Sequence, residues 1–261
     1  MIMASMAFMI SASAQSITRY LNVSDFDAVA VSGAMYVTIT QGDMHSVAIT
    51  GDRESIDKVA ADIVWGKLSL SVTAKQKRQL IKVWITTPVL TCMEVSGAVQ
   101  LSIVGNFSPQ NFTCKLGGAS QIDDLNITAF TTNIDIGGAS TVRISGNLGE
   151  CTLKVSGTSQ ANINASAATI TANAGGASQI KLAGEVNRVI VSTSGASRVN
   201  AGGLSASSGS VSTSGASSAT VNVRDHLRVS ASGASSVSYT GNPQLETISI
   251  SRSAKLKRKD N

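Results

Sequence analysis

Leu116-Gly117-Gly118-Ala119-Ser120-Gln121-Ile122 carries the phrase that decides the fold, and Ile136-Gly137-Gly138-Ala139-Ser140 repeats it one unit later. Most copies read Ser-Gly-Ala-Ser or Gly-Gly-Ala-Ser. The central glycines are Gly33, Gly97, Gly118, Gly138, Gly157, Gly176, Gly195, Gly215 and Gly233. From Gly97 onward, successive central glycines are 18 to 21 residues apart. A nearly constant period with a glycine turn in every unit predicts stacked coils.

Apolar residues recur at even distances from each central glycine. Around Gly138, Ile136 lies two residues before, and Val142 and Ile144 lie four and six residues after. Polar residues stand between them, which is the two-residue period of a strand with one buried face. Many of the apolar residues are β-branched, which favours strands. We therefore predict an all-β parallel β-helix or solenoid, in which each coil of about 20 residues holds a strand, a glycine turn, a second strand and a second turn. The main alternative is an antiparallel meander packed as a sandwich.

The glycine turn is interpreted as structural. Glycine accepts positive φ without a Cβ clash, and a small residue follows it wherever coils stack closely. A phosphate-binding P-loop would need a lysine and a following helix, and the phrase has neither. A calcium-binding nonapeptide would need a recurring aspartate, which is missing from the turn. We expect one line of turn glycines, with no cofactor and no metal.

Four charged residues stand three positions before the glycine in successive units, and their signs alternate. They are Glu94, Lys115, Asp135 and Lys154. Stacked strands lie about 4.8 Å apart, so equivalent positions form a side-chain ladder. We predict an outward-facing charge ladder, which is compatible with a simple solvated strand surface.

The chain is predicted to hold one elongated domain with two distinctive ends. Residues 1–14 are largely apolar and end in Ala12-Ser13-Ala14, which predicts a signal peptide, truncated at its start because a basic segment is missing. Residues 15–256 are predicted to form the solenoid, less regular over 15–90 and regular over 91–256, before a basic tail at 257–261. The stretch from Gly33 to Gly97 would hold about three coils. A helix is predicted over Arg53 to Ile63, starting near Asp52 or Ser55.

Charge and cysteine usage exclude several classes. The net charge is +5, but five of the basic residues lie in the last ten positions, so we predict no nucleic-acid-binding face. Cys92, Cys114 and Cys151 are odd in number and unrelated in spacing, which argues against a disulfide framework or a metal site. Cys114 and Cys151 stand at even distances from their central glycines, so the alternation of faces predicts that they point inward. Cys92 stands at an odd distance and is predicted to point outward. No segment is long and apolar enough to predict a transmembrane span.

The sequence offers no catalytic constellation. Asp123 and Asp124 are adjacent, so alternation predicts opposite faces, with Asp124 directed inward as a turn cap. His45 and His226 lie at predicted turns far apart in sequence, which gives no support to a Ser-His-Asp arrangement. A glycosidase would need carboxylates gathered in a cleft. We therefore expect no catalytic residue and no enzyme.

Several landmarks in order have a familiar layout: Phe26-Asp27-Ala28-Val29-Ala30-Val31-Ser32-Gly33, Gly51-Asp52, the serial Ser-Gly-Ala-Ser units and Val237-Ser238-Tyr239-Thr240-Gly241-Asn242-Pro243. Together, over about residues 16–256, they resemble the head GIN domain family of autotransporter adhesins, which are secreted bacterial β-solenoid proteins.

The resemblance implies a right-handed β-helix and an exported protein located in the periplasm, at the outer membrane or on the cell surface. It implies an adhesin that binds surface glycans, envelope proteins or host proteins, and it supplies no catalytic residues. Two alternatives stay open. One is a carbohydrate-active enzyme, a lyase or glycosidase, on a β-helix, and the other is a purely structural envelope module.

Overall fold

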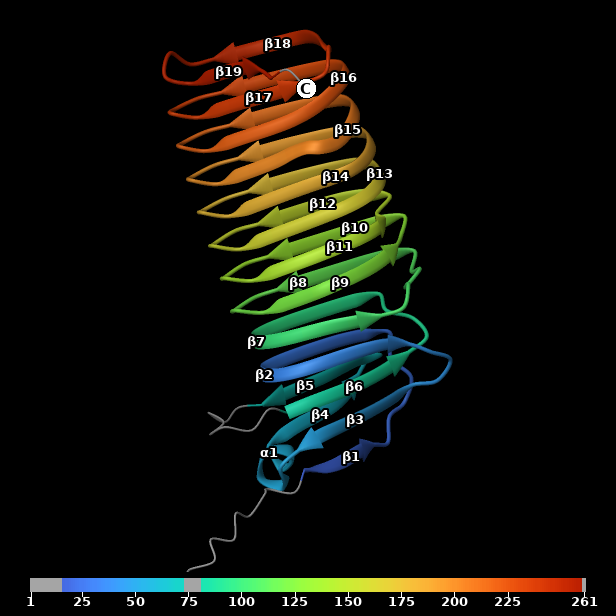
Figure 1. Ribbon diagram of the computed structural model, residues 1–261. Helices are drawn as coiled ribbons and strands as arrows, with labels where there is room; N and C mark the ends of the chain where they lie inside the picture. The colour runs from blue at the N-terminus through green and yellow to red at the C-terminus, as the bar shows by residue number, and fades with distance from the viewer. Residues whose placement is uncertain (1–15, 73–80, 260–261) are drawn as a thin grey trace, which may run out of the picture.

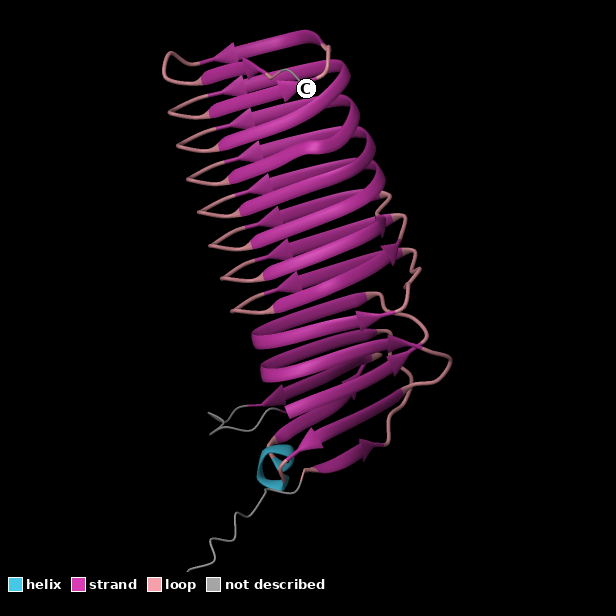
Figure 2. Ribbon diagram, viewed as in Figure 1, coloured by secondary structure: helices cyan, strands magenta, loops and turns pink. Residues whose placement is uncertain are grey.

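The structure, a computed structural model, describes residues 16–72 and 81–259. Strands stack into one elongated rod, and the only helix of the described residues lies at its N-terminal end (Figure 1; Figure 2). The N-terminal elements are β1 (Ile17–Leu21), β2 (Ala28–Gln41), β3 (Ser46–Gly51), α1 (Arg53–Asp57), β4 (Val59–Val64), β5 (Lys67–Val72) and β6 (Ile81–Thr87). The repeat region holds β7 (Cys92–Val104), β8 (Asn111–Leu116), β9 (Gln121–Thr128), β10 (Thr131–Ile136), β11 (Thr141–Asn147), β12 (Glu150–Val155), β13 (Gln160–Ala174), β14 (Gln179–Thr193), β15 (Arg198–Thr213), β16 (Ser218–Ala231), β17 (Ser236–Thr240), β18 (Gln244–Ile250) and β19 (Lys255–Arg258).

The repeat region is a stack of parallel coils. β13 pairs in parallel with β14, β14 with β15, and β15 with β16. In this register Ile163 opposes Leu182, and both side chains are buried, as the apolar columns of the sequence predict. Parallel pairing between successive units excludes the antiparallel sandwich and confirms the predicted all-β solenoid.

Each glycine turn sits directly on the turn of the preceding coil. Gly138 has a φ of 75°, and the backbone N–H of Ala139 donates to the carbonyl oxygen of Gly118 at 2.8 Å. A Cβ atom at Gly138 would lie 2.3 Å from that same oxygen. The other central glycines also have positive φ, and each one from Gly97 onward meets the glycine of the adjacent coil in this way. Both the backbone conformation and the close approach therefore exclude a side chain.

The serine that closes the turn is buried, and its hydroxyl is satisfied within the stack. Ser197 is 1% exposed, and its Oγ donates to the carbonyl oxygens of Ala174 at 3.0 Å and Ser194 at 2.8 Å. The equivalent buried serines are Ser120, Ser140, Ser159, Ser178, Ser217 and Ser235. A buried hydroxyl at this position is satisfied by backbone carbonyls of its own turn and of the preceding coil.

The N-terminal coils are not stacked in chain order. β2 pairs in parallel with β7, so that Gly33 opposes Gly97 directly. On its other side β2 pairs with β5 and β6, although both come later in the sequence. The coil of β2 thus lies between the coil of β5 and β6 and the coil of β7 (Figure 1). The prediction of about three stacked coils between Gly33 and Gly97 is wrong, because the intervening residues fold back beneath β2.

Antiparallel strands close the N-terminal end of the rod. β3 pairs antiparallel with β1 and β6, and β4 pairs antiparallel with β5. α1 begins after Asp52, whose carboxylate accepts a hydrogen bond from the backbone N–H of Ser55 at 2.9 Å. The predicted start of the helix is confirmed, but its predicted end at Ile63 is wrong. Residues 59–64 form β4 instead, because a turn at Trp65 and Gly66 pairs them with β5.

The C-terminal end is a further coil made of β18 and β19. Arg252 and Ser253 form its turn, where other coils have glycine and alanine. Arg258 opposes Tyr239 in β17, so β19 includes two residues of the predicted basic tail, and that tail boundary is two residues too early. The predicted signal peptide, residues 1–14, lies outside the described part of the chain.

Candidate functional site

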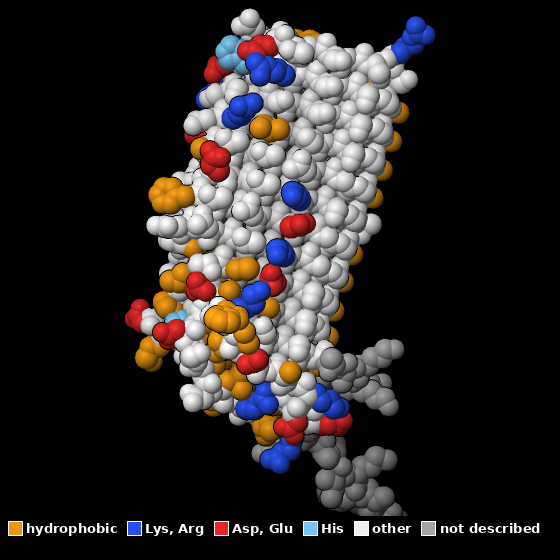
Figure 3. All heavy atoms as spheres, turned by 180° about the vertical axis from the view of Figure 1, so that it is seen from behind, with side chains coloured by type: hydrophobic (Ala, Val, Ile, Leu, Met, Phe, Trp, Pro, Cys, Tyr) orange, Lys and Arg blue, Asp and Glu red, His pale blue; other side chains and the backbone are white. Residues whose placement is uncertain are grey.

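The charge ladder lies on an outer face of the rod. The parallel registers place Glu94 opposite Lys115, Lys115 opposite Asp135, and Asp135 opposite Lys154. A line of alternating acidic and basic side chains runs along the axis on this face (Figure 3). Lys115 Nζ lies 3.2 Å from Glu94 Oε1, whereas Asp135 forms no ion pair within residues 16–72 and 81–259. The four residues share one column, and the ion pairing concentrates at its N-terminal end.

Lys67, which the repeat columns do not include, completes that end. Its Nζ lies 2.8 Å from Glu94 Oε2, so each carboxylate oxygen of Glu94 faces a lysine. Hydrogen bonds from Lys67 and Lys115 lower the pKa of Glu94 below its usual 4.5, and Glu94 in turn raises the pKa of Lys67. Both pairs are open to water, so each stabilises the fold by only about 0.2–1 kcal/mol. The positions of these pairs favour the observed register between the strands and keep this face of the rod soluble.

The three cysteines are free thiols. Cys114 and Cys151 are buried on the inward columns, as parity predicts, and Cys92 is half-buried beside the charge ladder. Burial raises the pKa of Cys151 to about 12 and raises that of Cys114 as well. The pKa of Cys92 is also raised, mainly by burial and to a lesser degree by the nearby Glu94 carboxylate. The thiols therefore stay protonated at neutral pH, the form in which cysteine neither attacks nor binds metal well.

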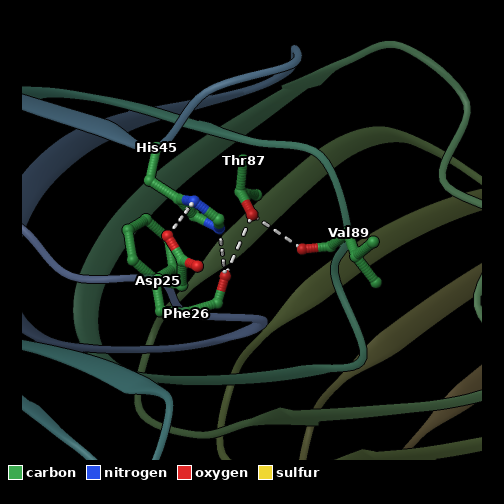
Figure 4. Close-up of polar contacts among 5 residues, drawn as sticks. All are labelled: Asp25, Phe26, His45, Thr87 and Val89. Atoms are coloured by element: carbon green, nitrogen blue, oxygen red, sulfur yellow. Dashed lines mark hydrogen bonds and ion pairs between the residues drawn. The ribbon is translucent and has the colours of Figure 1, made fainter.

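His45 joins Asp25 and Phe26 in a cluster at the start of β2 (Figure 4). Its Nδ1 lies 3.1 Å from Asp25 Oδ1, and its Nε2 lies 2.9 Å from the carbonyl oxygen of Phe26. The hydroxyl of Thr87 donates to that carbonyl at 3.1 Å and to the carbonyl of Val89 at 2.8 Å. In a catalytic triad the histidine Nε2 is hydrogen-bonded to the hydroxyl that it activates. Here Nε2 faces a carbonyl instead, so the cluster is not a triad. The cluster ties the start of β2 to β6 and the segment after it.

His226 forms a second cluster in the last coils. Its Nδ1 lies 3.0 Å from Glu246 Oε1, and Arg228 Nη2 lies 2.6 Å from Glu246 Oε2. Arg188 lines the same hollow from an earlier coil. A single carboxylate already held by two side chains does not provide the carboxylate pair that glycoside hydrolysis needs. The contacts fasten β18 to β16.

Asp123 and Asp124 do not face opposite sides. A β-bulge between Ile122 and Leu125 leaves Asp124 exposed with a φ of 53°, and Leu125 takes the inward position. Asp123 Oδ1 lies 3.2 Å from Arg143 Nη1 on the outer surface. The predicted inward cap at Asp124 is wrong, because the extra bulge residue resets the alternation.

A hollow of about 670 Å³ opens along the second-turn edge of the rod beside Phe130. The Phe130 side chain is 78% exposed, in a chain with only 4% aromatic residues. The hollow crosses several coils, and none of its lining residues carries a charge. The sequence does not predict this hollow, because no reactive or charged residue marks it. The available signal was a phenylalanine in a column whose next members are Gly149 and Ala168, each eight residues before its central glycine.

Residues 25–166 and 132–243 match the family model described as "Putative auto-transporter adhesin, head GIN domain". The chain belongs to this family. The resemblance stated from the sequence is thereby confirmed, and the head GIN domain assignment extends from just before β2 to just after β17. No curated protein sequence matches the chain.

Solved structures share the head GIN domain fold of this chain. A putative adhesin from Parabacteroides merdae is 17% identical, with 95% of this chain and 98% of that chain covered and a TM-score of 0.74. A putative adhesin from Parabacteroides distasonis is 19% identical, with 94% and 98% covered and a TM-score of 0.74. A putative lipid binding protein from the same species is 14% identical, with 95% and 98% covered and a TM-score of 0.65. At these identities the likeness establishes the fold alone.

Within residues 16–72 and 81–259, no three His, Cys, Asp or Glu side chains gather into a group that could hold a metal ion. The described residues also contain no helix that is long and apolar enough to cross a membrane.

Proposed function

We propose that this head GIN domain protein is a non-enzymatic adhesin, which presents the sides of a long solenoid for attachment to glycans or proteins. Membership of the adhesin family carries the proposal. The geometry supports it, because stacked coils repeat the same polar side chain along a rigid face. One example is the column formed by Gln100, Gln121, Thr141, Gln160 and Gln179.

Such a column suits recognition of an extended partner. Its members follow one another at the strand spacing of about 4.8 Å, and glutamine side chains offer both donors and an acceptor. The backbone groups beneath are used up in the parallel ladder, so the side chains alone face the partner. A rigid surface loses little conformational entropy when it binds.

The same proposal places the protein outside the cytoplasm, in the periplasm, at the outer membrane or on the cell surface. The apolar segment ending in Ala12-Ser13-Ala14 supports export, as does the family. We propose no cofactor and no catalytic residue. A glycosidase would need a pair of carboxylates, and neither the hollow beside Phe130 nor the hollow beside Arg188 is lined by one. A purely structural module would bind no ligand at all.

The test is binding of the full chain, fluorescently labelled, to a printed panel of glycans and surface proteins. Saturable retention on either class supports an adhesin. Retention on neither class favours a purely structural module and overturns the proposal. A parallel incubation with polysaccharides measures released reducing ends, and release above that of the heat-denatured chain would favour the enzyme.

A further inference from the structure

We propose that the hollow beside Phe130 binds an uncharged oligosaccharide made of pyranose rings. This proposal rests on the proposed adhesin function and assigns the ligand class to one place on the rod.

The floor of the hollow is a column of equivalent residues in successive coils. Each member directly precedes one of the residues Asn111, Thr131, Glu150, Thr169 and Arg188, which pair with one another from coil to coil. The members are Gln110, Phe130, Gly149, Ala168 and Asn187. Phe130 and Asn187 therefore lie three strand spacings apart, or about 14 Å. The two residues between them have almost no side chain, so an aromatic ring and an amide bound an open floor. That length accommodates a short stretch of linked sugar rings.

Packing of the coils creates this floor and holds it rigid. A Cβ atom at Gly149 would lie 2.1 Å from the carbonyl oxygen of Phe130, so the residue next to the ring has to be glycine. The backbone N–H of Phe130 donates to the Gln110 carbonyl at 3.0 Å, and the Phe130 carbonyl accepts from Glu150 N–H at 2.8 Å. Ala168 N–H donates to the Gly149 carbonyl at 2.8 Å. The ring is therefore carried by a backbone fixed on both sides, which reduces the entropy lost on binding.

The exposed ring indicates what binds. A phenyl ring that is 78% exposed gains most by covering its face, and that face carries the negative part of the ring quadrupole. One face of a pyranose ring presents several C–H groups, whose weakly positive hydrogens suit such a surface. Pro109 and Ala167 extend the apolar part of the hollow beside it.

The polar groups of the hollow are amides and hydroxyls. Asn187 and Gln110 stand at opposite ends of the floor, and neither side chain has an intramolecular hydrogen-bond partner within the described residues. Asn147 Oδ1 accepts from Gly149 N–H at 3.2 Å, which leaves its NH₂ group free to donate. An amide both donates and accepts, as sugar hydroxyls do. Neutral donors and acceptors around an apolar floor match an uncharged ligand better than an acidic one.

The hollow near Arg188 is the contrasting case. It gathers Arg188, Arg228 and His226, which would attract an acidic ligand, but Glu246 already occupies Arg228 and His226. An acidic glycan would have to displace that carboxylate. The Phe130 hollow requires no such displacement.

The experiment immobilises the full chain and measures binding of uncharged oligosaccharides, including cellohexaose, maltohexaose and chitohexaose, with oligogalacturonate as the acidic probe. We expect at least one uncharged probe to bind with a dissociation constant that NaCl leaves unchanged, since no charge lines the hollow. Phe130→Ala should weaken that binding about tenfold, and Phe130→Trp should retain it. Ala168→Glu should abolish it by filling the floor. Phe130 and Ala168 are both exposed, so circular dichroism should report an unchanged fold for all three variants.

Tyr20→Ala is the matched control, because it removes a ring that is 80% exposed on β1, away from the hollow, and should leave binding unchanged. Uncharged-probe binding that survives both Phe130→Ala and Ala168→Glu would overturn the site while leaving the adhesin function in place. Binding of oligogalacturonate alone, or of proteins alone, would overturn the ligand class. Absence of binding to every sugar probe would overturn this inference, whereas the adhesin proposal would be overturned only if the printed panel of glycans and surface proteins also retained nothing.

Discussion

The strands of the repeat region and strand β2 of the N-terminal region pair in parallel with their neighbours, but the distance along the chain between partners differs. In the repeat region each residue opposes its equivalent in the next unit, as Ile134 opposes Leu153. In the N-terminal region Val29 opposes Leu68 on one side and Met93 on the other. Periodicity therefore identifies neighbours only where each coil touches the next one. The first coils have no earlier coil to rest on, and later residues fold back to cover them.

The sharpest way to break the repeat region is to add one carbon atom at the glycine line. Gly138→Ala would place a Cβ atom 2.3 Å from the Gly118 carbonyl at a φ of 75°, so the stack would have to separate locally. We expect the free energy of unfolding to fall by about 3 kcal/mol, measured by urea denaturation.

Gly137→Ala is the matched control for this prediction. Its Cβ atom would lie 3.6 Å from Ser156 Oγ, an ordinary contact, and its φ is not in the left-handed region. We expect a change within about 0.5 kcal/mol. Equal effects at the two positions would contradict the role assigned to the glycine line.

The N-terminal region should instead depend on contacts between distant segments. Thr87→Val removes the buried hydroxyl that donates to the carbonyls of Phe26 and Val89, at nearly constant volume. Leaving these carbonyls short of a donor should lower the free energy of unfolding by about 1–3 kcal/mol. Hydrogen exchange should accelerate in β2, β3 and β6, while β14 to β16 keep their protection.

Thr50→Val gives the comparison for Thr87, because the Thr50 hydroxyl bonds Thr18 at 2.7 Å on the exposed surface. We expect a change of about 0.5 kcal/mol or less there. Accelerated exchange that spread through the whole rod would mean that the two regions unfold as one unit.

The smallest effect is expected at the charge ladder, where the two regions meet. Lys115→Glu would place three acids in a row with Glu94 and Asp135. The melting temperature should fall modestly, corresponding to about 0.2–1 kcal/mol, and the loss should be greater at low salt. An unchanged melting temperature at low ionic strength would contradict the ladder.

The pH dependence of this effect follows from Glu94. Its pKa is lowered in the folded chain, so its contribution is complete above the unfolded value near 4.5 and is lost as the pH falls through the lower folded value. The difference between the native chain and Lys115→Glu should therefore be largest near neutral pH and should shrink under acid. Glu94→Gln should flatten the acid limb of the stability curve.

The coils of the repeat region could be predicted from the sequence because each unit contains the residues that define its buried face and its turn. Alternating residues such as Val142 and Ile144 define the buried face, and Gly138 marks the turn. The position of β2 could not be predicted, because nothing near Val29 indicates that Leu68 will pair with it. The bulge at Asp124 could not be predicted for a related reason. One inserted residue reverses which side chains point inward without changing the composition of the strand.

The candidate site was predictable in part. The charge column was visible because its members share an offset, but Lys67 reaches Glu94 from a different position, which only the fold brings close. The hollow beside Phe130 arises from small residues next to a large one. The sequence does not reveal such a contrast in size, because none of these residues is chemically distinctive alone.

The placement of β2 between later strands also sets the order in which the rod can be assembled. A chain that emerges from its N-terminus delivers Ala28–Gln41 first, yet the neighbours of this strand arrive only with β5, β6 and finally β7. The pairing of β2 on both sides is therefore complete only when residue 104 has followed. From that point every further unit finds a finished edge to join. We therefore expect directional growth of the rod, because the closure at its base joins residues far apart in sequence and each later coil joins the one just before it.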